Sequence, residues 1–191
     1  MGGFVTLYNN AGFRLALPPF LLSHSAIAAI FLVYLLGSVS STWAGGLSQR
    51  LGRRRVFWAL VAAMGAGMAV TMFDNTIIVI LGLAIATMGF FAAHGVASAW
   101  VTRRARIGKA QASAIYLVAY YLGASILGTL GGYAWTAWAW SGVMLVSGGA
   151  ALLALLVAVR LTFIAPLPMP EQPSVPPLTS MTPGQAQAVQ A

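Results

Sequence analysis

Charge and cysteine are scarce in this chain of 191 residues. The absence of cysteine excludes disulfide frameworks, thiolate metal sites and cysteine catalysis. Only 6% of the residues are charged, whereas 60% are hydrophobic, so there is too little polar surface to cover a soluble fold of this length. The composition therefore predicts a membrane protein.

Acidic residues are limited to Asp74 and Glu171, and neither lies deep in an apolar segment. Chemistry by paired carboxylates is therefore excluded. A glycine-rich phosphate loop with its lysine is also missing, so the chain does not use ATP by itself. The only histidines, His24 and His94, offer no plausible hydrolytic triad. We expect neither an enzyme nor a bound cofactor or metal.

Long apolar segments account for most of the chain. A helix needs roughly 20 apolar residues to cross a hydrocarbon core of about 30 Å. Five segments meet this requirement, and we expect one transmembrane helix in each: 25–47, 56–73, 76–101, 112–135 and 138–159.

The segment before Arg14 is shorter. At about 1.5 Å per residue it spans roughly 20 Å, and Pro18 and Pro19 do not favour its continuation as a helix. We interpret residues 1–13 as the back end of a transmembrane helix whose front is missing from this chain.

Positive charge indicates the orientation in the membrane, because cytoplasmic loops carry most Lys and Arg. The net charge of +8 comes from short loops rather than one solvated face, so we expect no nucleic-acid partner. If each of the five segments crosses once, nine of the ten basic residues share one side, namely Arg50, Arg53, Arg54, Arg55, Arg103, Arg104, Arg106, Lys109 and Arg160. The other side receives Arg14, Asp74 and a tryptophan-rich corner at 135–140, which is typical of a membrane interface.

The C-terminal region differs in composition. Seven of the nine prolines lie between Pro166 and Pro183, among Gln, Ser, Thr and Ala. This composition is typical of a disordered segment. We therefore predict a transmembrane domain at 1–162 and a disordered cytoplasmic tail at 163–191, in a multi-pass plasma membrane protein such as one of the bacterial inner membrane.

The loop GGLSQRLGRRRV, beginning at Gly45, resembles the motif G-x-L-[SA]-D-[RK]-x-G-[RK]-[RK] of the major facilitator superfamily. Its matching positions are Gly45, Leu47, Ser48, Arg50, Gly52, Arg53 and Arg54. Gln49 stands where the family usually has aspartate. The motif is strongest between helices two and three of that family and recurs in degraded form between helices eight and nine, so the missing acid favours the second copy.

The same loop has a physical interpretation. Glycine at 45 and 52 allows a sharp turn between helix ends, while the arginines can bind helix C-terminal carbonyls and close the cytoplasmic side as a gate. The alternative is that these arginines only fix the topology, because an arginine at the bilayer centre costs about 2.5 to 3.5 kcal/mol.

The resemblance covers residues 1 to about 162 and implies the C-terminal half, helices seven to twelve, of a twelve-helix transporter. The implied fold is an all-α six-helix half-bundle built from two inverted three-helix repeats, with its first helix truncated. GFFAAHGVASAW and GKAQASAIYLVAYYLGASILGTLGG resemble the proton-linked efflux branch of sugar and drug exporters. The implied function is proton-coupled efflux of a small solute by alternating access.

The implied partners are the lipid bilayer, a small solute and protons. The half-bundle also needs a second half, which is either an N-terminal transporter half, on the same or a separate chain, or a second copy of this chain. The alternative hypothesis is a non-transporting truncated membrane protein or an assembly subunit.

Four glycines resemble the antiporter motif g-x-x-x-G-P-x-x-G-G, with Leu127 and Gly128 at its central Gly-Pro. They are Gly123, Gly128, Gly131 and Gly132. Plain helix packing explains the same pattern, since small residues let transmembrane backbones approach closely.

Polar residues within apolar segments are candidates for a substrate or proton pathway. His94 lies about 13 Å inside the cytoplasmic boundary and can exchange a proton near neutral pH. The alternative, which the sequence favours, is that His94 only donates a hydrogen bond to a backbone carbonyl across a glycine-lined helix contact. Tyr116 and Tyr120 share a helix face and can line a cavity with Asn9 and Asn10. Such a cavity suits neutral or cationic amphiphiles or sugars, and the alternative is simple helix–helix hydrogen bonding.

Overall fold

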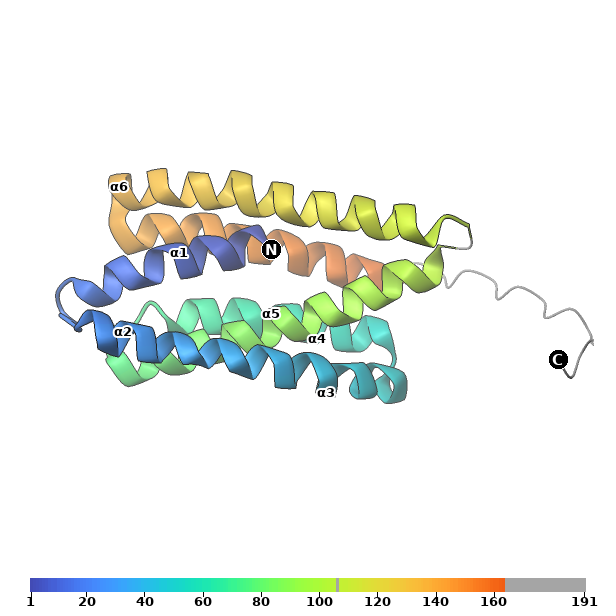
Figure 1. The fold of residues 1–191 in the computed structure, drawn as a ribbon, viewed down its shortest axis with the longest axis horizontal. Coiled ribbons are helices and arrows are strands. Elements are labelled where there is room, and N and C mark those ends of the chain that lie inside the picture. Colours follow the sequence, from blue (N-terminus) through green and yellow to red (C-terminus); the bar gives the residue numbers. More distant parts are fainter. Residues whose placement is uncertain (106, 164–191) are drawn as a thin grey trace, which may run out of the picture.

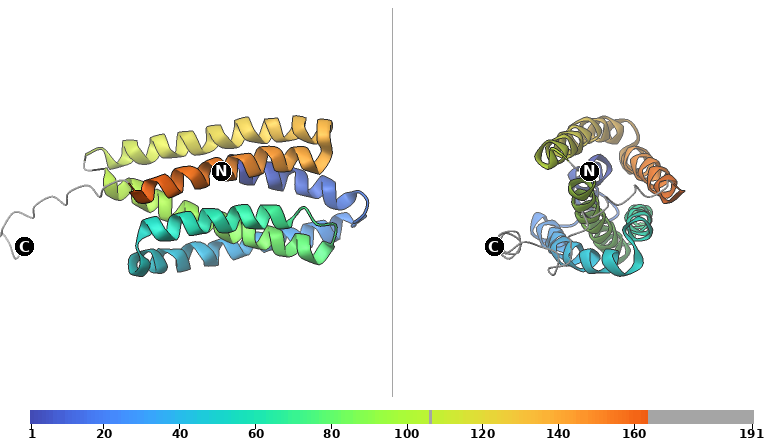
Figure 2. Two further views of the ribbon diagram at one scale, coloured as in Figure 1. Left: turned by 180° about the vertical axis from the view of Figure 1, so that it is seen from behind. Right: turned by 90° about the vertical axis from the view of Figure 1, so that its right-hand side faces the viewer.

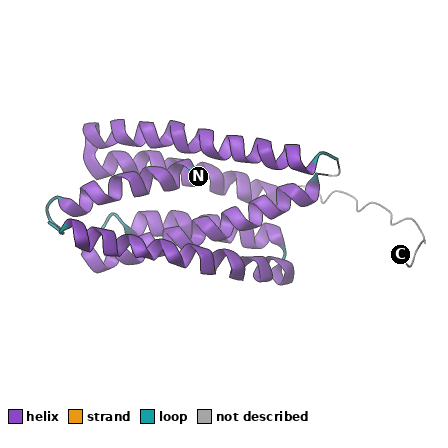
Figure 3. Ribbon diagram, viewed as in Figure 1, coloured by secondary structure: helices purple, strands orange, loops and turns teal. Residues whose placement is uncertain are grey.

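The computed structural model describes residues 1–105 and 107–163, and within them every regular element is a helix (Figure 3). The all-helical prediction is therefore confirmed for this part of the chain. Arg106 and residues 164–191 lie outside the described residues, so nearly all of the predicted tail at 163–191 is outside them, while its first residue, Phe163, ends α6. The elements are α1 (Gly2–Ala16), α2 (His24–Ile30), the 3-10 segment η1 (Phe31–Leu35), α3 (Leu36–Leu51), α4 (Arg53–Val70), α5 (Thr76–Arg104) and α6 (Lys109–Phe163).

The helix α6 contains a reversal that divides it into two antiparallel limbs (Figure 1). Trp138 and Ala139 leave the helical conformation there, and Ala139 has a φ of 49°. The reversal falls at the tryptophan-rich corner, where the sequence predicted the boundary between two membrane segments. The segments 112–135 and 138–159 thus correspond to the two limbs.

Within residues 1–105 and 107–163, three helical stretches are long and apolar enough to cross a membrane, namely His24–Leu51, Thr76–Arg104 and Lys109–Phe163. The first of these joins α2, η1 and α3 into one path. The predicted segment 56–73 largely coincides with α4, which is not among the three because three of its 18 residues are arginines.

Packing divides the bundle into two groups of helices. Helix α1 packs on α6, while α3 and α4 pack on α5, and contacts between α4 and α6 join the two groups (Figure 2). The core is apolar and includes Phe4, Leu7, Met68, Leu83 and Val143. Helix α1 has 15 residues, and its N-terminus lies part of the way along the bundle (Figure 1).

The connections gather at two opposite ends of the bundle (Figures 1 and 2). One end carries the α3–α4 junction, the end of α5, and both the first and last turns of α6. The other carries residues 17–23, the α4–α5 turn and the reversal within α6. Arg14 and Asp74 belong to this second end, apart from the arginine-rich α3–α4 junction.

The turn between α3 and α4 corrects one expectation. Gly45 lies inside α3 and makes no turn, so that prediction was wrong. Gly52 alone separates the two helices, with a φ of +86° that a residue with a Cβ adopts only under strain. The chain reverses direction at Gly52 itself, so the turn between the two helices needs no second glycine.

Candidate functional site

Aromatic side chains from four elements meet between the helices of the bundle, and we call this group the aromatic cluster. Its members are Phe4 and Tyr8 of α1, Phe31 and Tyr34 of η1, Phe90, Phe91 and His94 of α5, and Tyr116 and Tyr120 of α6. Three helices each contribute a pair at i and i+4, a spacing that places both rings on one helix face. The closest contact is a stacked pair, Phe4 and Phe90, with ring centroids 4.1 Å apart.

His94 joins α5 to the first limb of α6 through this cluster. Its Nδ1 lies 2.8 Å from the hydroxyl of Tyr116, a hydrogen bond in which either group can donate, according to the imidazole tautomer. The ring of Tyr120 lies 4.6 Å from the imidazole, centroid to centroid. The structure thus brings together His94, Tyr116 and Tyr120, and the hydrogen bond of His94 is to a side chain rather than to a backbone carbonyl.

The two asparagines of α1, Asn9 and Asn10, are not among the residues that the structure brings together with His94. Asn10 is buried, and its Nδ2 donates to the carbonyl of Thr6 one turn earlier, at 2.8 Å. Asn9 is exposed and lies beside Gly128 of α6. The residues that α1 contributes to the cluster are instead Phe4 and Tyr8.

Tyr8 is a polar member of the cluster that sequence reasoning missed. Its hydroxyl hydrogen-bonds Thr87 Oγ1, which itself donates to the carbonyl of Leu83 at 2.7 Å. A threonine hydroxyl has one hydrogen, so Tyr8 is the donor to Thr87. The i, i+4 spacing of Phe4 and Tyr8 was the available signal in the sequence.

The glycines of α6 hold α1 at close range. A Cβ at Gly131 would lie 2.5 Å from Thr6 Cγ2, and one at Gly128 would lie 3.3 Å from Val5 Cγ1. Thr6 also donates its hydroxyl hydrogen to the carbonyl of Leu127, at 2.7 Å. A Cβ at Gly123 would lie 3.9 Å from the backbone nitrogen of Gly2. Three of the four motif glycines therefore lie against α1, as the helix-packing interpretation requires.

Substitution of the neighbouring glycines 131 and 132 tests this contact. Thr6 is β-branched and fully buried, so it cannot easily move away from a new methyl group at position 131. We expect Gly131→Ala to destabilise the chain by about 1–2 kcal/mol. Gly132→Ala is the matched control because a Cβ there meets nothing within 4 Å. Equal unfolding temperatures for the two variants in detergent would contradict the contact.

The arginine-rich loop lies at the end of the bundle. Gln49 and Arg50 are exposed, whereas Arg53 and Arg54 are half-buried at the start of α4. Ser48 is buried, and its hydroxyl donates to the carbonyl of Gly45 at 2.8 Å. The gating role of this loop stays a prediction.

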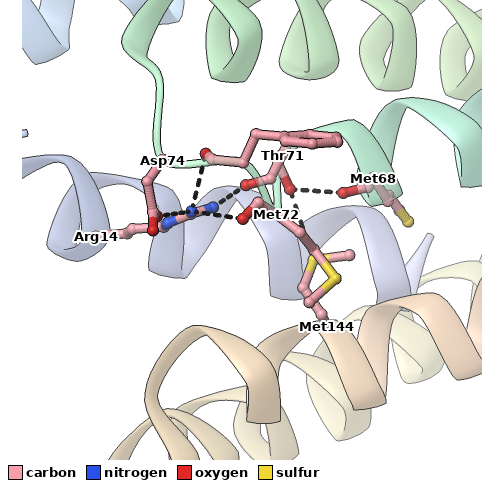
Figure 4. Close-up of polar contacts among 7 residues, drawn as sticks. Arg14, Met68, Thr71, Met72, Asp74 and Met144 are labelled. Carbon is pink, nitrogen blue, oxygen red and sulfur yellow. Dashed lines mark hydrogen bonds and ion pairs between the residues drawn. The ribbon is translucent and has the colours of Figure 1, made fainter. Parts of the chain in front are cut away.

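Arg14 forms a polar site that the sequence did not predict (Figure 4). One guanidinium nitrogen, Nη1, donates to the carbonyl of Thr71, and the other, Nη2, lies 3.2 Å from the carbonyl of Phe73 and 3.1 Å from Asp74 Oδ1. These carbonyls follow the last turn of α4, where backbone acceptors lack partners within the helix. The side chain of Arg14 is 8% exposed, whereas that of Asp74 is 72% exposed.

Two aromatic rings complete this site, which we call the Arg14 clasp. The guanidinium carbon lies 5.2 Å from the ring centroid of Phe20 and 4.7 Å from that of Trp140. Both distances are within the range of cation–π attraction. The clasp therefore ties α1, the α4–α5 turn and the second limb of α6 together at one end of the bundle.

A separate groove of about 390 Å³ lies between α4 and the second limb of α6. None of its lining residues has a polar side chain, and the lining includes Gly65, Ala69 and Gly148. None of the residues predicted for a substrate or proton pathway lines it. The groove therefore offers no polar chemistry, and the aromatic cluster is the better candidate site.

Comparison with known proteins identifies the class to which this fold and site belong. Residues 1–188 match the Major Facilitator Superfamily, and the chain belongs to this family of membrane transporters. It is therefore a multi-pass membrane protein of a transporter family and not an enzyme.

Relatives support the same assignment. The chain is 43% identical over 161 residues to the inner membrane transport protein YnfM of Escherichia coli, covering 84% of this chain and 39% of that protein. It is 42% identical over 143 residues to an uncharacterized transporter of Buchnera aphidicola from Schizaphis graminum, covering 75% and 35%. It is 39% identical over 144 residues to the uncharacterized MFS-type transporter YybF of Bacillus subtilis, covering 75% and 36%. The chain thus spans well under half the length of these relatives, and no solved structure matches it.

Proposed function

We propose that this chain forms the C-terminal half of a secondary transporter that exports a small solute in exchange for protons by alternating access. We assign six helices to a half-bundle of two inverted three-helix repeats: α1, the α2–η1–α3 path, α4, α5 and the two limbs of α6. The match over 35% to 39% of the length of the relatives supports a half-transporter unit. An N-terminal half, on the same or a separate chain, or a second copy then completes the transporter.

The observation that carries this proposal is the hydrogen bond between His94 and Tyr116 within the aromatic cluster. In residues 1–105 and 107–163 the only carboxylate is Asp74, which lies at the end of the bundle. The proton-carrying role therefore falls to the imidazole of His94, whose ring nitrogens can take up and release a proton. Tyr116 of α6 is hydrogen-bonded to this imidazole of α5. A change in the protonation of His94 can therefore alter the contact between α5 and α6.

The charge distribution supports a cytoplasmic location for the α3–α4 junction and for the C-terminus, in a plasma membrane such as the bacterial inner membrane. YnfM is described as an inner membrane protein. In this orientation Arg50, Arg53 and Arg54 close the cytoplasmic side of the transporter, and the Arg14 clasp lies at the outer side.

Replacement of His94 by glutamine tests the proton-coupling role. The chain is co-expressed with the N-terminal half of a relative, and export of compounds from a panel is followed in inverted vesicles with and without a pH gradient. We expect His94→Gln to reduce gradient-driven export to background, because the amide cannot take up a proton. His24→Gln, at the exposed start of α2, is the matched control and retains export.

Two outcomes would contradict the proposal in different ways. Export by His94→Gln that still depends on the pH gradient would remove His94 from the coupling step. Absence of export in every pairing, with both halves folded in the membrane, would favour the non-transporting membrane subunit instead.

A further inference from the structure

We propose that the apolar groove between α4 and the second limb of α6 holds one acyl chain of a phospholipid, whose headgroup carries a primary ammonium group and lies at the Arg14 clasp. This inference goes beyond the proposed function, because it assigns a lipid site and does not depend on the solute. It follows from the length of the groove, from an exposed carboxylate at one end and from a buried donor without a partner at the same end.

The groove is about as long as one leaflet of a bilayer. On α4 it runs from Val61 to Met72, and on α6 it runs from Met144 to Leu155. Each stretch covers eleven residue steps, or about 17 Å at 1.5 Å per residue. Half of a hydrocarbon core of about 30 Å is about 15 Å. A partner helix that crosses the membrane would need a contact surface along the whole core, so an acyl chain fits this groove better.

Small residues leave the groove open. Gly65, Ala66, Ala69 and Gly148 contribute to its lining, and a Cβ at Gly148 would meet nothing within 4 Å. Leu152, also in the lining, is 58% exposed, and α4 and the second limb of α6 lie side by side on the outside of the bundle (Figure 2). Unfilled space beside packed helices loses van der Waals contacts, which an alkyl chain restores.

One end of the groove, at Met72 and Met144, adjoins the Arg14 clasp (Figure 4). Nη2 of Arg14 lies 3.4 Å from the carbonyl of Met72 and 3.1 Å from Asp74 Oδ1. Arg14 is buried against carbonyl groups, whereas Asp74 is 72% exposed, so the clasp presents a negative charge to its surroundings. A headgroup ammonium is attracted to this carboxylate, and a primary ammonium also donates hydrogen bonds to it.

Trp140 places a hydrogen-bond donor at the same end of the groove. It precedes Met144 by four residues, so the two side chains share a face of α6. The side chain of Trp140 is buried, and its Nε1 has no hydrogen-bond partner among the residues that the structure describes. A buried N–H without an acceptor is costly. The ester carbonyls of a phospholipid join its headgroup to its acyl chains, so they supply an acceptor at this depth.

The experiment measures binding of single phospholipid molecules to the 191-residue chain by native mass spectrometry in dodecyl maltoside. The three lipids have identical acyl chains and differ in the headgroup, which is ethanolamine, choline or glycerol. We expect the ethanolamine lipid to bind about 2- to 5-fold more tightly than the choline lipid, the range of an exposed ion pair. The glycerol lipid, which is an anion, should bind most weakly.

Two neighbouring glycines locate the acyl chain. Gly148→Leu fills the groove, so we expect it to weaken binding of all three lipids by at least about 5-fold, the range for overfilling a packed space. Gly149→Leu is the matched control. A Cβ at Gly149 also meets nothing within 4 Å, but Gly149 does not line the groove, so the affinity should stay unchanged.

Variants of the polar groups separate the headgroup from the ester group. Asp74→Asn removes the exposed charge and should abolish the preference for the ethanolamine lipid. Trp140→Phe keeps an aromatic ring but loses the donor, so it should weaken binding of all three lipids equally, by about 2- to 12-fold, the range of one hydrogen bond. Trp138→Phe is its control, because Trp138 is 66% exposed and lies in the reversal of α6.

Three results would overturn the inference: equal lipid binding by Gly148→Leu and Gly149→Leu, equal affinity of the unchanged chain for the three headgroups, or an affinity of Trp140→Phe equal to that of Trp138→Phe. A dimer that Gly148→Leu dissociates, with no lipid on the monomer, would also overturn it and assign the groove to a helix of a second copy. The proposed function fails separately, since absence of export in every pairing leaves the lipid site intact.

Discussion

Replacement of Arg14 by leucine is expected to lower the free energy of unfolding by about 3 kcal/mol, because it leaves the carbonyl of the buried residue Thr71 without a donor. Thr71, whose carbonyl accepts from Nη1, is fully buried, and no other hydrogen bond to that oxygen is found among the described residues. The ion pair contributes less to this loss, since Asp74 is largely exposed and its charge is screened. Equilibrium unfolding in bicelles, followed by tryptophan fluorescence, provides the measurement.

Two further variants separate the geometry of the Arg14 clasp from its charge. Arg14→Lys retains the positive charge but lacks the planar fork that reaches several acceptors, so an intermediate loss is expected. Arg50→Leu removes an exposed arginine from the opposite end of the bundle and should change the stability by less than about 0.5 kcal/mol. An Arg14→Leu variant as stable as Arg50→Leu would show that the clasp does not hold the three elements together.

Substitution of Gly89 is expected to have a comparably large effect, because α4 and α5 are in backbone contact there. A Cβ at Gly89 would lie 2.6 Å from the backbone nitrogen of Met64 and 2.8 Å from the carbonyl oxygen of Leu60. Backbone atoms cannot rotate away as a side chain can, so the helices must separate. We expect Gly89→Ala to cost about 1–3 kcal/mol and Gly89→Leu to prevent the native packing of α4 on α5.

The control for Gly89 is a glycine with free space around it. A Cβ at Gly46, inside α3, would meet nothing within 4 Å. Gly46→Ala should therefore stabilise the helix by up to about 1 kcal/mol, through its better helix propensity. Opposite signs for the two Gly→Ala substitutions, measured as unfolding temperatures in the same bicelles, are the expected result. A loss at Gly46 as large as that at Gly89 would contradict the proposed backbone contact.

Only part of the candidate site could be predicted from the sequence. Tyr116 and Tyr120 were expected on one helix face because residues four apart on a helix are neighbours, and the structure places both beside His94. Asn9 and Asn10 are adjacent, so they point in directions about 100° apart on a helix. Whether either of them faces the cluster depends on how α1 is rotated against its neighbours, and the sequence pattern does not contain that rotation.

The helices, the reversal within α6 and the separation of basic residues between the two ends could be determined from the sequence alone. Apolar length and positive charge in loops are properties of short stretches of chain, so each can be recognised without its tertiary neighbours. The family also followed from such a stretch, the loop that begins at Gly45.

The Arg14 clasp and the close backbone contacts were decided only by the tertiary structure. Arg14 and Thr71 are 57 residues apart, and Thr6 and Leu127 are 121 residues apart. These contacts exist only when particular helix faces meet, and in an apolar chain many faces satisfy the local pattern equally well. The helices and their boundaries were therefore local properties of the sequence, whereas the partners of each buried polar group depended on packing across the whole bundle.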